Sequence, residues 1–348
     1  MESFNGLLAV IRDDLAAQEW EGACASLQAA FEKLNSDAKA MLVDRCTPAL
    51  VHAIERHESG EDACGGAATL ASACAALNAL VTGLPAGAKQ SALRVEKGIV
   101  PALLRVLGDE NGKAAWGHAC FALGDLVDGL PADATESMLG DGHGIVEAIA
   151  GVLESDQADA FAAAGVALGK VLSGLPAATK QTLLCDEKGI VRRLLSVLGD
   201  SRGKASSGDP HGAMRSIHLF LRDACRTLNS FLRDLPPSSK SLLLSQSQLV
   251  ATIISVLESE DAHSCWAVAM ELLKRLAFQD ASLSHINFGT LDFLEKDCGL
   301  MAVLLRCSDG FSIEADSKCF KSACSALVPL SLTNSVKPTV CSRFAQRF

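Results

Sequence analysis

Two glycine-lysine segments are the part of the sequence that most resembles a site for chemistry. Residues 108–114 and 199–205 share the pattern Gly-x-x-x-Gly-Lys-Ala, which is similar to the loop that holds nucleotide phosphates. That loop needs four residues between its glycines and a Ser or Thr after the lysine to bind Mg²⁺. Both segments lack the fourth residue and the hydroxyl, and no strand pattern precedes either one. We therefore interpret both as turns.

Metal ligands and nucleophiles are present, but not in arrangements that make a site. His57 and Glu58 form the only His-Glu pair, and a single pair cannot supply the ligands of a metal centre. The 13 cysteines include no Cys-x-x-Cys pair and no Cys/His cluster at zinc spacing. The His-Glu-x-x-His and kinase motifs are absent from the sequence. We predict no catalytic residue, no metal site and no cofactor.

The balance of charged residues argues against some classes of binding partner. Lys and Arg total 31 against 41 Asp and Glu, so the formal net charge is −10. Nucleic-acid binding needs a concentrated basic face, and neither the total nor any run of Lys and Arg supplies one. Every apolar stretch is broken well before the roughly 18 residues that are needed to span a bilayer. We predict a protein or peptide partner, with no nucleic acid and no membrane insertion.

Two short markers recur together along the chain. Gly-Leu-Pro begins at residues 83, 129 and 174, and Gly-Ile-Val begins at 98, 144 and 189, so both advance in steps of 46 and 45 residues. Asp234-Leu235-Pro236 continues the first marker, and Gln248-Leu249-Val250 continues the second. Periods of about 40–47 residues are typical of armadillo and HEAT repeats.

The residues between the markers predict helices. Apolar residues such as Ala119, Leu123 and Leu126 recur at the spacing of one helical face. In each Gly-Leu-Pro we expect the glycine to end a helix in the left-handed conformation, the leucine to make an apolar contact and the proline to start the next helix. The glycine before Ile-Val is expected to close that next, shorter helix. Residues 140–144 fall at this second marker and are interpreted as a loosened turn.

One position of the repeat is most often a cysteine, within the pattern Ala-Cys-x-x-Leu. Its occupants are Cys24, Cys74, Cys120, Gly165, Cys225, Met270 and Cys324. A position that accepts Cys, Gly or Met is typical of buried packing, so we predict free, buried thiols and no structural disulfides. A core kept as free thiols favours a reducing compartment, and we predict the cytoplasm or nucleus.

Residues 98–104, read with 122–126, resemble an armadillo repeat, whose last helices read approximately Gly-Ile-Pro-x-Leu-Val-x-Leu-Leu and Trp-Ala-Leu-Ser-Asn-Leu. The resemblance spans nearly the whole chain. It implies an all-α fold, a right-handed armadillo/HEAT-like solenoid of about six or seven repeats.

The repeats occupy most of the chain. We predict one α-solenoid domain over residues 1–348, with repeats over about 20–330 and a capping helix over 1–19. Residues 199–213 are rich in Gly, Ser, Lys and Asp and lengthen one repeat, so we expect an inserted, mobile surface loop there. The last stretch, 333–348, is a polar tail.

In nuclear-import receptors of this family, Trp and Asn from the last helix of each repeat line a concave groove that holds a peptide. Other residues stand at both positions here, so the ladder of Trp and Asn is absent. The two positions vary from repeat to repeat, and we therefore expect their side chains, Phe121 and Asp125 among them, to face solvent on the concave side. Leu123 and Leu126 should point between the layers. The candidate partner-binding residues are Phe121, Asp125, Lys170, Arg226, Ser230, Glu271 and Arg275.

The leading hypothesis for function is a scaffold or adaptor that binds a peptide or helical segment of a partner protein along the concave face, and not an enzyme. The alternative is a catalytic or cofactor-binding protein similar to the HEAT-like hydroxylases and lyases. Di-iron hydroxylases of that kind repeat a His-Glu dipeptide once per helical pair, whereas this chain has one. Stoichiometric iron or pigment in the purified protein would favour the alternative.

Overall fold

The computed structural model describes residues 6–9, 17–58, 66–93, 98–139, 143–155 and 157–185, with 225–230 and the positions 232, 235, 236, 239, 269, 271 and 272. The regular elements among these residues are helices, and no strand occurs among them. The chain divides into two compact units, residues 1–176 and 177–348. The predicted loop at 199–213, the tail at 333–348 and Arg275 lie outside the described residues, and the prediction of one continuous domain stays a prediction.

The first unit is a succession of helices. Its described helices are α2 (Ala17–Glu32), α3 (Ser36–Glu58), α4 (Gly66–Val81), α5 (Ala86–Ala92), α6 (Ile99–Gly108), the short 3₁₀ turn η2 (Glu110–Gly112), α7 (Lys113–Val127), α8 (Ala132–Leu139), α9 (His143–Val152) and α10 (Ala158–Gly174). Helix α11 (Ala177–Cys185) belongs to the second unit. Residues 17–19, predicted as the end of a capping helix, instead begin α2.

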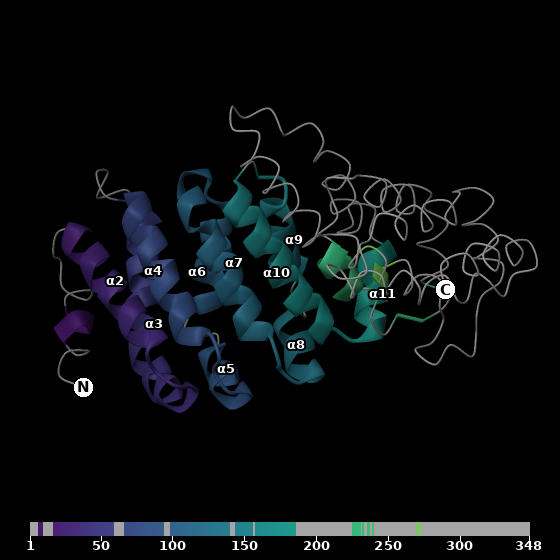
Figure 1. Cartoon of the computed structure of the whole chain (residues 1–348), viewed down its shortest axis with the longest axis horizontal. Coiled ribbons are helices and arrows are strands. Elements are labelled where there is room, and N and C mark those ends of the chain that lie inside the picture. Colours follow the sequence, from purple (N-terminus) through teal and green to yellow (C-terminus); the bar gives the residue numbers. More distant parts are fainter. Residues whose placement is uncertain are drawn as a thin grey trace, which may run out of the picture. The chain divides into compact units, whose positions relative to one another are not determined.

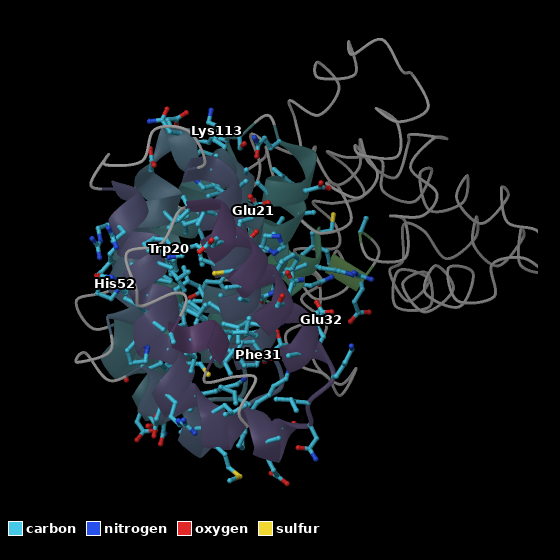
Figure 2. The ribbon with its side chains drawn as sticks, turned by 90° about the vertical axis from the view of Figure 1, so that its left-hand side faces the viewer. Trp20, Glu21, Phe31, Glu32, His52 and Lys113 are labelled. Atoms are coloured by element: carbon cyan, nitrogen blue, oxygen red, sulfur yellow. The ribbon has the colours of Figure 1, made fainter. Side chains whose placement is uncertain are left out.

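These helices form two layers within the first unit. The long helices α2, α4, α7 and α10 lie side by side, each in contact with the next (Figure 1). Helices α3, α6 and α9 form a second layer against them. Figure 2 looks at the unit from the α2 end: Trp20 and Phe31 are buried between α2 and its neighbours, whereas Glu32 and His52 lie exposed on opposite sides. The core therefore sits between the layers and is built largely of Ala, Leu, Val and Cys.

Successive repeats differ in how many helices they contain. The second and third repeats have three helices each, α5-α6-α7 and α8-α9-α10, as armadillo repeats do, whereas α3 and α4 form a pair. Gly98 has a φ of 61° and is the N-cap of α6. It thus starts the following helix, and the expectation that it closes the preceding one is not met. Arg45 occupies the same repeat position within α3, and because an arginine disfavours positive φ the helix continues there.

The Gly-Leu-Pro turns follow the prediction in part. Gly83 and Gly129 adopt the left-handed conformation, with φ of 77° and 75°. The leucines that follow the glycines are buried in all three turns, as expected: Leu84, Leu130 and Leu175. Gly174 departs from the prediction, because α10 runs through it and no left-handed φ is found there. At the third Gly-Leu-Pro, therefore, the helix ends one residue later, at an extended Leu175 and not at a left-handed glycine.

The first glycine-lysine segment is a turn, as predicted. Gly108 ends α6, η2 follows, and Lys113 begins α7. The Asp109 carboxylate accepts a hydrogen bond of 2.9 Å from the Asn111 N–H, and the Trp116 indole N–H donates one of 2.9 Å to the Val106 carbonyl. The second of these bonds provides a partner for a carbonyl group in the last turn of α6. Residues 140–142 and 199–205 lie outside the described part of the chain.

The cysteines at the repeated position are buried free thiols, which confirms their predicted packing role. Cys24, Cys74, Cys120 and Cys225 have no exposed surface and form no disulfide. Burial raises the pKa of the Cys24 and Cys120 thiols to about 12. It raises the pKa of Cys74 as well, as does the neighbouring Cys24. Because the thiolate is the reactive form, these three side chains should be inert near neutral pH.

We therefore expect iodoacetamide to leave Cys24, Cys74 and Cys120 unmodified in the native protein at pH 8. Pulse alkylation followed by peptide mapping in a mass spectrometer would measure each site separately. The same protein in guanidinium chloride supplies the control, because all three sites should then react fully. Alkylation of Cys120 in native protein at the rate of an unfolded thiol would contradict the packing role.

Candidate binding face of the long helices

Part of each long helix remains accessible on the side away from the core. The partly exposed residues there are mostly small, and we call this set the long-helix face: Ala71, Ser72 and Asn78 of α4; Gly117, His118 and Phe121 of α7; Ala162, Val166, Gly169 and Lys170 of α10. Small side chains follow from the close approach of the helices. A Cβ atom on Gly117 would lie 3.8 Å from the Ala160 Cα atom of α10.

Phe121 is the bulkiest apolar side chain of the long-helix face. It is partly exposed, in agreement with the expectation that it faces solvent. His118 precedes it by three residues and therefore lies beside it on the helix surface. Burial lowers the pKa of His118 below its usual value of 6.5, so its imidazole is neutral at pH 7. The two rings therefore lie on the same face near the middle of α7.

Asp125 does not face solvent, and the expectation for this residue is wrong. It is only 8% exposed. The Thr82 hydroxyl donates a hydrogen bond of 2.5 Å to Asp125 Oδ2, and the Lys170 ammonium forms an ion pair with Oδ1. The reason is the tight packing of α7 on α10: a Cβ atom on the neighbouring Gly124 would lie 2.8 Å from the Ala167 Cα atom, so α10 covers this part of α7. A position that varies between repeats can therefore still be enclosed.

Asp125 and Lys170, two candidate partner-binding residues from successive repeats, are in contact in the structure. Together with Thr82 they join α4, α7 and α10 through side-chain contacts. The Lys170 side chain keeps 31% of its surface exposed while that of Asp125 keeps 11%. The ammonium therefore stands at the edge of the long-helix face with its carboxylate partner beneath it. Lys170 remains accessible to a partner, but it is already neutralised in part.

The other predicted residues belong to the second unit. Arg226 is exposed, and Ser230 and Glu271 are partly exposed, so none of these three is enclosed as Asp125 is. Arg275 lies outside the described residues.

Sequence reasoning missed a set of buried lysines. Lys39 and Lys89 are 7% and 6% exposed, and Lys180 has no exposed surface. The Lys39 ammonium donates to the carbonyl oxygens of Ala79, at 2.7 Å, and Thr82, at 3.0 Å. The Lys89 ammonium donates to the Asp128 carbonyl oxygen at 2.5 Å. Each of the three lysines stands five residues after a leucine at a helix end, and this spacing is visible in the sequence.

Asp125 also supplies negative charge near these lysines. Burial lowers the pKa of Lys39, and the carboxylates of Asp125 and Glu32 oppose that shift. Burial lowers the pKa of Lys89 too, with Asp128 and Asp125 acting against it and Lys170 acting with it. Asp125 is thus a structural centre for several cations, because a buried ammonium needs a nearby counter-charge or carbonyl oxygens.

The described residues contain no group of three or more His, Cys, Asp and Glu that could hold a metal ion. In the same part of the chain, no helix is long and apolar enough to cross a membrane. The long-helix face presents small side chains, the partly exposed ring of Phe121 and, at its edge, the ion pair of Lys170 with Asp125.

No protein-family model matches the sequence, and no curated protein matches it significantly. Solved structures do match. A crystal structure of importin beta aligns with a TM-score of 0.65 and 15% identity over 95% of this chain and 36% of that chain. Uso1-1 aligns with a TM-score of 0.61 and 12% identity over 96% of this chain and 53% of that one. An engineered protein aligns with a TM-score of 0.56 and 21% identity over 82% of this chain and 97% of that chain.

The chain is an all-α helical-repeat solenoid. The resemblance to armadillo and HEAT repeats stated from the sequence is confirmed at the level of architecture, since the match to importin beta covers nearly the whole chain. Kap95p in complex with RanGDP aligns as well, with a TM-score of 0.58 and 15% identity over 99% of this chain and 42% of that chain. The solenoid spans less than half the length of importin beta and of Kap95p. Identities this low show the fold alone.

Proposed function

We propose that this solenoid is a protein-binding scaffold, which holds a peptide or helical segment of a partner protein on the long-helix face. The proposal rests mainly on the partial exposure of Phe121, a large apolar side chain on that face. Aromatic residues, Phe among them, are enriched in the cores of protein interfaces, where a few large side chains contribute most of the binding energy. The structurally similar Kap95p binds RanGDP, which supports a binding role for the architecture and assigns no partner to this chain.

The residues expected to contact the partner follow from this assignment. Phe121 is the proposed anchor and Lys170 a charged contact at its edge, with Arg226, Ser230, Glu271 and Arg275 as further contacts in the second unit. We assign Asp125 a positioning role, because its buried carboxylate forms an ion pair with the Lys170 ammonium. The proposal assigns no catalytic step and no cofactor. The free buried thiols favour a partner in the cytoplasm or nucleus.

Phe121→Ala should weaken partner binding about tenfold or more, because it removes the aromatic anchor. The partner would first be identified by photo-crosslinking and mass spectrometry, and its Kd would then be measured for each variant. The free energy of unfolding should change by no more than about 1 kcal/mol, since the ring is only partly buried.

Met41→Ala is the matched control, because Met41 is 76% exposed on α3, outside the long-helix layer. It should leave the Kd unchanged. Equal Kd values for wild type, Phe121→Ala and Met41→Ala would show that the partner does not use the long-helix face. Stoichiometric iron or pigment in the purified protein would argue against the scaffold itself.

A further inference from the structure

The buried lysines mark one position in the repeat. The position lies five residues after the leucine that follows each long helix, and its occupants in chain order are Lys39, Lys89, Thr135, Lys180 and Lys240. Lysine is rarely buried in proteins, so its recurrence at an enclosed position calls for a specific role. Thr135 is the one exception among these five positions.

Each of the first two lysines binds the end of the next long helix. The Lys39 ammonium, from α3, donates to two carbonyl oxygens in the last turn of α4, those of Ala79 and Thr82. The Lys89 ammonium, from α5, donates to the carbonyl oxygen of Asp128 directly after α7. A helix end exposes carbonyl groups without partners and carries partial negative charge, so an ammonium there is favourable on both counts.

The lysine contacts coincide with the left-handed glycines. Thr82 and Asp128, whose carbonyl groups accept from Lys39 and Lys89, immediately precede Gly83 and Gly129. These two glycines have φ of 77° and 75°. In both turns, therefore, an ammonium from a helix earlier in the chain binds the peptide group at which the chain leaves the long helix.

In the part of the chain that the structure describes, the turn after α10 lacks this arrangement. Thr135 is too short to reach across, and its hydroxyl donates to the Pro131 carbonyl at the start of its own helix at 3.1 Å. Helix α10 continues through Gly174, and a Cβ atom on Gly174 would lie 3.5 Å from the Thr135 side chain. The cation near this junction comes from α10 itself, as Lys170 pairs with Asp125 one repeat back. The boundary between the two compact units lies directly after Pro176.

We propose that the recurring lysine is a clasp that fixes the left-handed end of each long helix, and that the third repeat, with Thr135 in its place, leaves the end of α10 free to fray or extend. The end of α10 is thereby an adjustable point beside the two clasped ends of α4 and α7. Lys180, which has no exposed surface, stands at the same repeat position in the second unit. This inference is independent of the proposed partner binding, because it concerns only helix ends.

Amide hydrogen exchange on the full chain, read by mass spectrometry on short peptides, tests the proposal. In wild type, amides of residues 172–175 should exchange about tenfold faster than those of 127–130, because local opening sets the exchange rate. Lys89→Thr should raise exchange about tenfold at 127–130 and leave 172–175 unchanged. Thr135→Lys should slow exchange at 172–175. Lys33→Thr, at an exposed lysine, should change neither segment.

Equal protection of 127–130 and 172–175 in wild type would overturn the proposal. So would a Thr135→Lys protein whose 172–175 amides exchange as fast as in wild type. If Lys89→Thr does not fold, Lys39→Thr is read at 81–84, where the Leu84 N–H donates to the Val81 carbonyl. Unchanged exchange at 81–84 in Lys39→Thr would then decide against the clasp.

Discussion

Leu123→Ala is expected to lower the free energy of unfolding by about 2–5 kcal/mol. Leu123 has no exposed surface and lies in the middle of α7, which contacts α4 on one side and α10 on the other. Its truncation removes apolar contacts and leaves a cavity that rigid neighbouring helices cannot fill. Urea denaturation followed by circular dichroism at 222 nm would measure the change, and the loss should appear as a lower midpoint.

The control for Leu123→Ala is Met41→Ala, which shortens a comparable apolar side chain that is 76% exposed. We expect its free energy of unfolding to lie within about 0.5 kcal/mol of wild type. A cost below about 1 kcal/mol for Leu123→Ala would mean that the side chain does not fill a packed site in the core.

Gly124→Ala is expected to destabilise the protein by about 1–3 kcal/mol, although alanine is the better helix former. A Cβ atom added at Gly124 would lie 2.8 Å from the Cα atom of Ala167 and 3.1 Å from its Cβ atom. The nearest obstacle is backbone, so α7 and α10 must move apart to admit the methyl group. Their separation would also disturb the ion pair between Asp125 and Lys170.

Gly22→Ala makes the same chemical change where nothing lies within 4 Å of the new Cβ atom. Gly22 is exposed within α2, so the substitution should raise the free energy of unfolding by up to about 1 kcal/mol. The two variants should therefore shift the thermal midpoint in opposite directions. Shifts of the same sign would indicate that α7 and α10 pack less closely than the structure has them.

Local signals carried most of the correct predictions. The turn at 108–113 needed only its glycines and the neighbouring helix patterns, and it is found as expected between α6 and α7. The buried cysteines followed from one position that accepts Cys, Gly or Met, because a packing site tolerates small apolar groups of similar size. Asp125 shows the limit of that reasoning, since variation at a position does not reveal how near the adjacent helix lies.

From the sequence alone we could predict the helical-repeat architecture, the buried repeated cysteines and the left-handed turns at Gly83 and Gly129. These features could be predicted because a 45- to 46-residue period and helix-end glycines act within one repeat. Which polar groups are enclosed could be seen only once the helices were packed together. Asp125 is buried by the approach of α10, and Lys39 finds its acceptors 40 and 43 residues away at the end of α4. Such contacts depend on the spacing between helices. That spacing is set by the packed side chains of several repeats together, so it cannot be read from the sequence of one repeat.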